Sequence, residues 1–264
     1  MIKPNIIILA AGRGKRLGNY TENLPKGMVK LQGKPILRWQ LQNIKKIDNA
    51  NIIIVRGYKK EKLEEFDATF IENDNYENTN MVTSLWCAKD FFHDSFIMAY
   101  SDIVYNSDVL KKLLKSKKSI SVVVDRKWKA YWKNRRTNFL EDTESLSLNK
   151  NGSISSIGQK VLDTKDIIGQ YIGLVYFQKH GVELVKNIIQ KEINANQNGE
   201  SHICEGKMLN ELYITDLLQG LINDGIDIYP LWIDGGWIEI DTKQDLMLAH
   251  KITASKESYL SIQR

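Results

Sequence analysis

The sequence has 264 residues, enough for one large α/β domain with a buried core, and no apolar stretch approaches the roughly 20 residues of a membrane span. Its net charge of +5 is mild and fits anionic small-molecule substrates without requiring nucleic acid. The two cysteines fit no zinc spacing, and no signal peptide precedes the first apolar run. We therefore expect a single cytoplasmic domain over residues 1–264, either monomeric or homodimeric.

The first half of the chain alternates expected strands with expected helices. Continuous apolar runs predict buried strands, and apolar residues at helical spacing predict amphipathic helices. The expected strands are 5–11, 51–55, 69–72, 95–100 and 119–124. The expected helices are 35–47, 60–66, 83–92 and 106–115. This order requires right-handed crossovers and predicts an α/β fold, a Rossmann-like three-layer sandwich around a mainly parallel mixed sheet.

The character of the sequence changes at about residues 125–168. This stretch is rich in aromatic and charged residues, and Asn151-Gly152 between two β-prone runs predicts a hairpin. We interpret it as a small β-hairpin or lid insertion. The expected strands beyond it are 172–177, 226–233 and 237–241, and the expected helices are 182–193, 211–224 and 242–251.

A glycine-rich turn, L-A-A-G-R-G-K-R-L, follows the first expected strand. Its small residues let backbone N–H groups approach phosphate oxygens, and Arg16 can present a planar fork of donors to them. The spacing is neither that of a Walker A loop nor that of the dinucleotide fingerprint. A plain turn remains the alternative. The residues expected at a nucleotide are Leu9, Ala10, Ala11, Gly12, Gly14 and Lys15.

Two further motifs continue the pattern, L-P-K-G-M-V at 24–29 and G-K-P-I-L at 33–37. With them the chain resembles the superfamily of sugar-nucleotide transferases and cytidylyltransferases. Members open with a strand, then L-A-A-G-x-G-x-R-L, then P-K, then G-K-P. The match extends over the first 37 residues. It implies attack of an acceptor phosphate oxygen on the α-phosphorus of a nucleoside triphosphate.

The resemblance assigns catalytic roles to two basic residues. Arg16 is implied to bind the β- and γ-phosphates, and Lys26 to bridge the α-phosphate and the acceptor. Lys15 either assists or is solvated. Such a step depends on positioning and positive charge more than on a general base, because an acceptor phosphate is already ionised.

The resemblance also implies a Mg²⁺ site. Asp102, after the expected strand 95–100, matches the first metal aspartate of the family, with Ser101 in place of the usual glycine. Asp241 matches the second. Magnesium is commonly held by one or two carboxylates together with substrate phosphates. Each aspartate could instead be a helix N-cap, above all Asp241, which precedes an expected helix.

The segment 78–85, N-T-N-M-V-T-S-L, resembles an element of phosphocholine-type cytidylyltransferases. Polar groups at a helix start can contact a cytosine edge or a ribose. We expect Ser84 to do so first, followed by Asn80 and Thr83. Simple N-capping by Asn80 or Thr83 is the alternative.

Motifs in the second half resemble the branch that contains phosphocholine cytidylyltransferases and relatives of phosphonate and capsule-decoration pathways. Aromatic residues there could surround a quaternary ammonium, acidic residues could pair with an amine, and arginine could hold a carboxylate. Packing within the insertion is the alternative. The expected acceptor-binding residues are Trp128, Tyr131, Trp132, Arg135, Glu144, Gln170, Tyr171, Trp237 and Glu239.

These patterns predict a CTP-dependent cytidylyltransferase. Its acceptor would be a small molecule of the phosphoglutamine or phosphocholine type, or a phosphonate, and its product would serve surface polysaccharide or capsule decoration. One alternative is a sugar-1-phosphate nucleotidyltransferase that uses UTP, GTP or dTTP. Another is a non-catalytic nucleotide-binding module. We expect no nucleic-acid or membrane partner.

Overall fold

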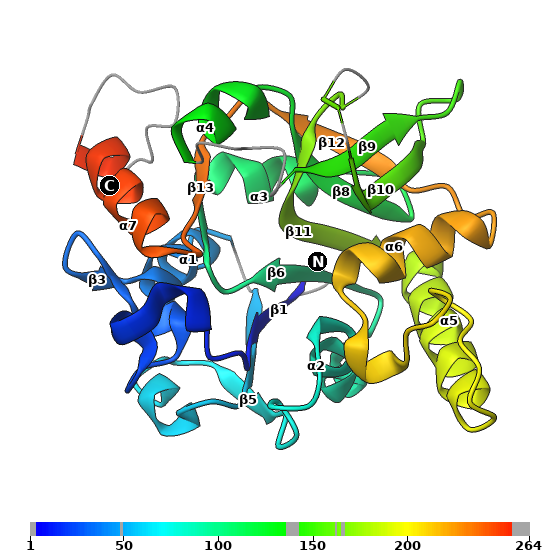
Figure 1. Cartoon of the computed structure of the whole chain (residues 1–264), viewed down its shortest axis with the longest axis horizontal. Coiled ribbons are helices and arrows are strands. Elements are labelled where there is room, and N and C mark those ends of the chain that lie inside the picture. Colours follow the sequence, from blue (N-terminus) through cyan, green and yellow to red (C-terminus); the bar gives the residue numbers. More distant parts are fainter. Residues whose placement is uncertain (1–3, 48–49, 136–142, 162, 165–166, 255–264) are drawn as a thin grey trace.

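A computed structural model describes residues 4–47, 50–135, 143–161, 163–164 and 167–254. Its centre is a seven-stranded sheet in the order β12-β8-β11-β6-β1-β4-β5 (Figure 1). The strands are β1 (Asn5–Ala10), β4 (Asn51–Arg56), β5 (Thr69–Glu72), β6 (Ser95–Tyr100), β8 (Ile120–Asp125), β11 (Gln170–Gln178) and β12 (Tyr229–Ile233). Only β11 among these strands runs antiparallel to its neighbours, so the mainly parallel mixed sheet is confirmed.

Helices cover both faces of this sheet and make the expected three layers (Figure 1). They are α1 (Ile36–Ile44), α2 (Met81–Cys87), α3 (Ser107–Leu113), α4 (Trp128–Arg135), α5 (His180–Asn196), α6 (Ile214–Asn223) and α7 (Lys243–Ala254). Short 3-10 helices are η1 (Lys15–Thr21), η2 (Lys26–Met28), η3 (Lys60–Leu63), η4 (Lys89–Phe91) and η6 (Leu209–Glu211).

Strand β1 shows why the core has two halves. Successive side chains of a strand point to opposite faces, so Ile6 and Ile8 pack in the cluster beneath α1 and α3. Ile7 and Leu9 pack in the cluster beneath α2, α5 and α6. Because both faces are covered, the strand is apolar throughout.

Three two-stranded ladders accompany the large sheet in the described parts of the chain. The predicted hairpin is present as β9 (Glu144–Leu148) and β10 (Ile154–Lys160), with Gly152 at φ +82° in its turn. The other ladders are β2 (Lys30–Leu31) with β3 (Lys34–Pro35), and β7 (Ile103–Tyr105) with β13 (Trp237–Glu239).

Several element boundaries differ from expectation. The expected helix 83–92 begins at Met81, capped by Asn80, and ends at Cys87 before a separate 3-10 turn. The expected helix 60–66 is the short 3-10 helix η3. The expected helix 211–224 begins only at Ile214, because the backbone N–H of Tyr213 donates to the carboxylate of Asp216 in a cap.

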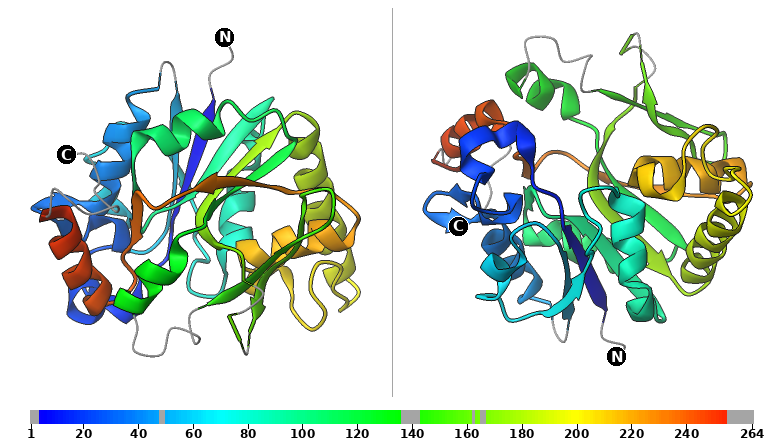
Figure 2. Two further views of the ribbon diagram at one scale, coloured as in Figure 1. Left: turned by 90° about the horizontal axis from the view of Figure 1, so that it is seen from above. Right: turned by 60° about the horizontal axis from the view of Figure 1, so that its bottom comes forward.

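Helix α7 lies against η1 and α4, as Figure 2 shows for the red and blue segments. The C-terminal part of the described chain therefore reaches back to the glycine-rich turn. Within the described residues, no helix combines the length and the apolar character needed to cross a membrane.

Candidate active site

The candidate active site lies where β1 and β6 end side by side. β1 lies between β4 and β6 and is parallel to both. The chain adds β4 and β5 on one side of β1 and then crosses to add β6 on the other side, so the strand order reverses at β1. Open α/β sheets bind ligands at the carboxyl ends of strands at such a switch point. Gly12 follows β1 and Asp102 follows β6 at this edge.

A second ladder brings Asp241 to the same place. Strands β7 and β13 pair antiparallel with Glu239 opposite Ile103. The backbone N–H of Ile240 then donates to the carbonyl of Asp102 at 2.9 Å. This register places Asp241 beside Asp102, although the two residues lie far apart in the sequence.

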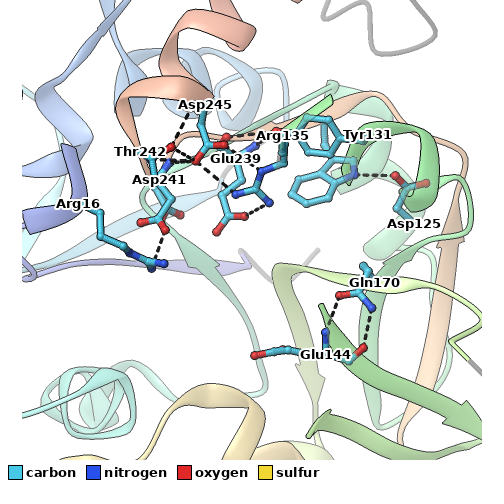
Figure 3. A network of polar contacts seen from close by, with 12 residues as sticks. Arg16, Asp125, Tyr131, Arg135, Glu144, Gln170, Glu239, Asp241, Thr242 and Asp245 are labelled. Carbon is cyan, nitrogen blue, oxygen red and sulfur yellow. Dashed lines mark hydrogen bonds and ion pairs between the residues drawn. The ribbon is translucent and has the colours of Figure 1, made fainter. Parts of the chain in front are cut away.

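Lys26 lies between the two aspartates. Its Nζ is 2.5 Å from Asp102 Oδ2 and 2.5 Å from Asp241 Oδ1. Arg16 approaches from the solvent side, with its guanidinium 2.6 Å from Asp241 Oδ2 (Figure 3). The Lys26 side chain is 12 % exposed and that of Arg16 is 66 % exposed, so Lys26 is held within the site while Arg16 remains accessible.

The charge of Lys26 is secured by its neighbours. Burial acts to lower the pKa of Lys26, but the carboxylates of Asp102 and Asp241 raise it, and so does Glu239. The net result is a pKa above the ordinary lysine value. Lys26 is therefore an ammonium at neutral pH and cannot serve as a base there.

The glycine-rich turn supports Lys26 directly. Gly14 has φ +73°, a conformation that side chains rarely adopt, and a Cβ at this position would lie 2.9 Å from Lys26 Cβ. A glycine is needed here both for the turn and for the close approach of the lysine. The same turn therefore orients Lys26 and forms the wall of the cleft.

A first cleft of about 210 Å³ opens above these residues. It contains Arg16, Lys26 and both aspartates. Other expected residues that line it are Leu9, Ala11, Gly12, Gly14, Ser101, Asn80 and Ser84. Three expected nucleotide-binding residues do not line it: Ala10, Lys15 and Thr83. Ala10 is buried in the sheet, Lys15 borders an outer hollow, and Thr83 Oγ1 donates to the carbonyl of Leu209 at 3.2 Å.

The polar residues at the start of α2 combine two roles. Asn80 caps the helix, since its Oδ1 accepts from the backbone N–H of Met81 at 2.9 Å. Ser84 Oγ donates to the Asn80 carbonyl at 3.3 Å and accepts from Asn73 Nδ2 at 3.0 Å. N-capping is thus present at Asn80, and the side chains of Asn80 and Ser84 also line the first cleft.

A second cleft of about 180 Å³ meets the first at Arg16, Met81, Tyr100 and Asp241. The expected acceptor residues that line it are Trp132, Glu144, Gln170, Tyr171, Trp237 and Glu239. Two adjoining clefts that share a cation and a carboxylate can hold two ligands end to end.

The second cleft is acidic. Glu144 and Glu239 both line it, and Arg16 at the junction is the single basic residue among the described lining. Burial raises the pKa of Glu239 to about 7, against the opposing effect of Arg135, and the nearby Asp102 and Asp241 act in the same direction as burial. A ligand with an ammonium group would relieve this crowding of carboxylates.

Three expected acceptor residues do not reach the cleft. Trp128 and Tyr131 are 1 % exposed, and their rings pack in a cluster with Trp132 and Trp237 at centroid distances of 5.5–6.0 Å. The Arg135 guanidinium is buried and pairs with Glu239 and Asp245. In this structure these side chains support the cleft from behind, because α4 turns its aromatic face inward.

Gln170 lines the cleft but uses its amide elsewhere. Its carbonyl accepts from Glu144 N at 3.2 Å, and its NH₂ donates to Glu144 O at 2.7 Å (Figure 3). This pair joins β9 to β11. Gln170 therefore fixes the position of Glu144.

Several other residues that line the two clefts were not predicted from the sequence. Tyr76, Thr79, Met81 and Tyr100 line the first cleft, and Tyr213 and Thr215 line the second. Thr79 and Met81 belong to the segment 78–85, so that motif could have indicated them. Tyr213 comes from the loop before α6, which has no distinguishing pattern.

The aspartate pair fits a divalent cation. Asp102 Oδ1 is buried and has no hydrogen-bond partner within the described residues. A buried carboxylate oxygen of this kind beside a second carboxylate suits a hard cation such as Mg²⁺. No group of three or more potential metal-ligating side chains occurs in the described parts of the chain, so substrate phosphates and water would complete the coordination.

Comparisons with known proteins show the family of this chain. The family model of the MobA-like NTP transferase domain matches residues 6–163. The chain is 35 % identical over 256 residues to CTP:phosphoglutamine cytidylyltransferase of Campylobacter jejuni, a match that covers 92 % of this chain and 97 % of that protein. It is 35 % identical over 109 residues to choline-phosphate cytidylyltransferase of Haemophilus influenzae, a match that covers 40 % of this chain and 46 % of that protein.

Two solved structures share the fold. The CTP:phosphocholine cytidylyltransferase of Streptococcus pneumoniae superposes with a TM-score of 0.71 at 23 % identity, covering 95 % of this chain and 99 % of that one. The inositol-1-phosphate CTP transferase of T. maritima gives a TM-score of 0.66 at 16 % identity, and the match covers 95 % of this chain and 96 % of that one.

Proposed function

Because this chain belongs to the MobA-like NTP transferase family, we propose that it is a cytidylyltransferase that transfers CMP from CTP to a small phosphorylated acceptor and releases pyrophosphate. The observation that carries the proposal is the junction of two clefts at Arg16 and Asp241. The first cleft takes the nucleotide beside the glycine-rich turn. The second takes the acceptor, whose phosphate meets the nucleotide at the junction.

The reaction needs no base from the protein. An ionised oxygen of the acceptor phosphate attacks the α-phosphorus of CTP, a new P–O bond forms, and the bond from the α-phosphorus to the bridging oxygen breaks. Pyrophosphate leaves with the electron pair of that bond. Lys26 stabilises the negative charge that builds on the α-phosphoryl oxygens, and Arg16 binds the departing β- and γ-phosphates.

Positioning follows from the same residues. The backbone after β1 approaches the triphosphate, and Ser84 and Asn80 face the base or ribose from the start of α2. Asp102 and Asp241 would hold a Mg²⁺ ion, which when bound supplies further positive charge to the triphosphate. Lys26 already contacts both carboxylates, so it leaves this position, at least in part, as the substrates bind.

The acceptor of the proposal carries an ammonium group. Glu144 and Glu239 supply negative charge at the second cleft, and Trp132, Tyr171 and Trp237 supply aromatic walls. We rank phosphoglutamine first, because the relative of that name matches over nearly its whole length. Phosphocholine and an aminoalkyl phosphonate follow. We further propose a cytoplasmic enzyme whose product serves surface polysaccharide or capsule decoration.

A pyrophosphate-release assay tests the proposal. CTP, UTP, GTP and dTTP are each combined with phosphoglutamine, phosphocholine, phosphoethanolamine, aminoethylphosphonate and glucose 1-phosphate in the presence of Mg²⁺. We expect release with CTP and an amine-bearing acceptor. Release only with glucose 1-phosphate and another nucleotide would establish the alternative sugar-nucleotide activity. No release with any pair would refute the proposal.

A further inference from the structure

The segment from Glu239 to Asp245 carries two of the carboxylates on which both clefts depend. Glu239 lines the second cleft, and Asp241 stands at the junction. The β13 ladder ends at Glu239 and α7 begins at Lys243, and between them the bond from the backbone N–H of Ile240 to the Asp102 carbonyl holds the main chain. Its remaining contacts must determine where the two carboxylates point.

Arg135 on α4 supplies one such contact. Its guanidinium is 2.8 Å from Glu239 Oε2, and its Nε is 3.1 Å from Asp245 Oδ1 (Figure 3). The Arg135 side chain is 0 % exposed, as is that of Asp245, whereas the Glu239 side chain is 25 % exposed. The arginine therefore connects a cleft carboxylate with one that is wholly internal.

Two further contacts extend this link. Tyr131, one turn before Arg135 on α4, accepts a hydrogen bond at its hydroxyl from Glu239 N at 2.9 Å. Asp245 Oδ2 accepts from the backbone N–H groups of Asp241 at 3.2 Å and Thr242 at 2.9 Å. One face of α4 thus holds the main chain and the carboxylate of Glu239, and through Asp245 it holds the main chain of Asp241.

The pairing of Arg135 is chemically demanding. A buried guanidinium loses its hydration, and this cost is met only by well-placed carboxylates. Of the two carboxylates that pair with it among the described residues, Glu239 still faces the cleft, where water or a ligand competes for it. Asp245 Oδ2 is already engaged by the backbone N–H groups of Asp241 and Thr242, so Glu239 is the carboxylate that the Arg135 contact can orient.

We infer that Arg135 is a positioning residue that fixes the Glu239 carboxylate toward the acceptor cleft, so that it controls acceptor affinity without touching the acceptor. This inference rests on the proposed function. It also replaces the expectation that Arg135 contacts an acceptor carboxylate.

The test compares Michaelis constants for the two substrates. In Arg135→Met we expect the KM of the acceptor to rise about tenfold, in line with the loss of a charged hydrogen bond. The KM of CTP should change less than about twofold, because Lys26 and Arg16 also hold the Asp241 carboxylate. Arg135→Lys should recover part of the acceptor affinity. Arg126→Met is the matched control, because Arg126 also forms a two-point ion pair, with Asp234, but on the surface away from both clefts.

A double variant separates positioning from general support. If Arg135 acts through Glu239, Arg135→Met should add less than about twofold to the acceptor KM in a Glu239→Gln background. Additive losses, or equal increases of both Michaelis constants, would overturn the inference. If Arg135→Met does not fold, as judged by its thermal transition, Tyr131→Phe provides the same comparison, because it removes only the hydroxyl contact to Glu239.

The wild-type protein separates this inference from the proposed function. A wild-type chain that releases no pyrophosphate with any acceptor refutes both. An active wild type whose folded Arg135→Met variant keeps the wild-type acceptor KM refutes the inference alone. If that variant does not fold, an unchanged acceptor KM in Tyr131→Phe does so.

Discussion

The glycine-rich turn and helix α4 make an informative contrast. Both segments combine cations with other residues suited to ligands, and both looked like binding elements in the sequence. The structure places Gly12, Gly14, Arg16 and Lys26 around a cleft. It places Trp128, Tyr131 and Arg135 in the interior, behind another cleft.

The contrast shows which kind of pattern predicts a binding site. A turn after a buried parallel strand has little freedom, since Gly14 must take a positive φ and the strand end must lie at the sheet edge. On α4 the residues of interest recur at positions 128, 131, 132 and 135. This is the i, i+3, i+4, i+7 spacing of a buried helical face. The spacing indicated packing more strongly than the residue types indicated ligand binding.

Among the variants that test this contrast, Lys26→Met should cause the largest loss of kcat/KM. It removes the ammonium between Asp102 and Asp241, and we expect kcat/KM to fall roughly 10³-fold, as for loss of a transition-state donor. Steady-state pyrophosphate release measures this. Lys30→Met, which removes an exposed lysine from β2, should retain wild-type rates. A Lys26→Met enzyme with near-normal turnover would remove Lys26 from the mechanism.

Gly14→Ala comes next. The new Cβ would press on the Lys26 side chain, and we expect kcat/KM to fall roughly ten- to a hundredfold because the ammonium is displaced. Gly33→Ala is the matched control, since Gly33 also has a positive φ but no described atom within 4 Å of the new Cβ. It should lose only stability, about 1–2 kcal/mol. Similar activity losses in both variants would mean that backbone strain alone is responsible.

Trp128→Phe tests the interior assignment of α4. We expect the free energy of unfolding to fall by about 1–3 kcal/mol with both Michaelis constants unchanged, because the ring packs behind the cleft. Trp132→Phe, which alters a ring that lines the cleft, should change the acceptor KM. Denaturant unfolding and kinetics on both variants decide the matter. A selective change of the acceptor KM in Trp128→Phe would restore its original assignment.

Ser84→Ala should have the smallest effect. We expect the KM of CTP to rise about fivefold, the equivalent of one neutral hydrogen bond, with the acceptor KM unchanged. Ser155→Ala on the hairpin gives the comparison, since the Ser155 hydroxyl lies 2.8 Å from that of Ser147 and the residue is outside both clefts. An unchanged KM of CTP in Ser84→Ala would assign Ser84 to helix packing alone.

Much of the fold could be predicted from residue patterns. Apolar runs located the strands of the large sheet, and Asn151-Gly152 located the hairpin. Helix ends were less predictable, because Asn80 and Asp216 cap α2 and α6 through contacts that periodicity does not register. The capping role of Asp245 at the start of α7 could have been predicted, since Thr242 and Asp245 have the three-residue spacing of a capping box.

By itself the sequence determined the α/β fold and the glycine-rich turn, because both depend on local conformation and on apolar periodicity. Only the tertiary structure decided that Lys26, Asp102 and Asp241 meet within hydrogen-bonding distance, since the register of β7 with β13 joins distant parts of the chain. It also decided which aromatic rings line the second cleft and which lie behind it. The side of α4 that turns inward depends on what α7 and β13 present to it, and no single stretch of sequence contains that information.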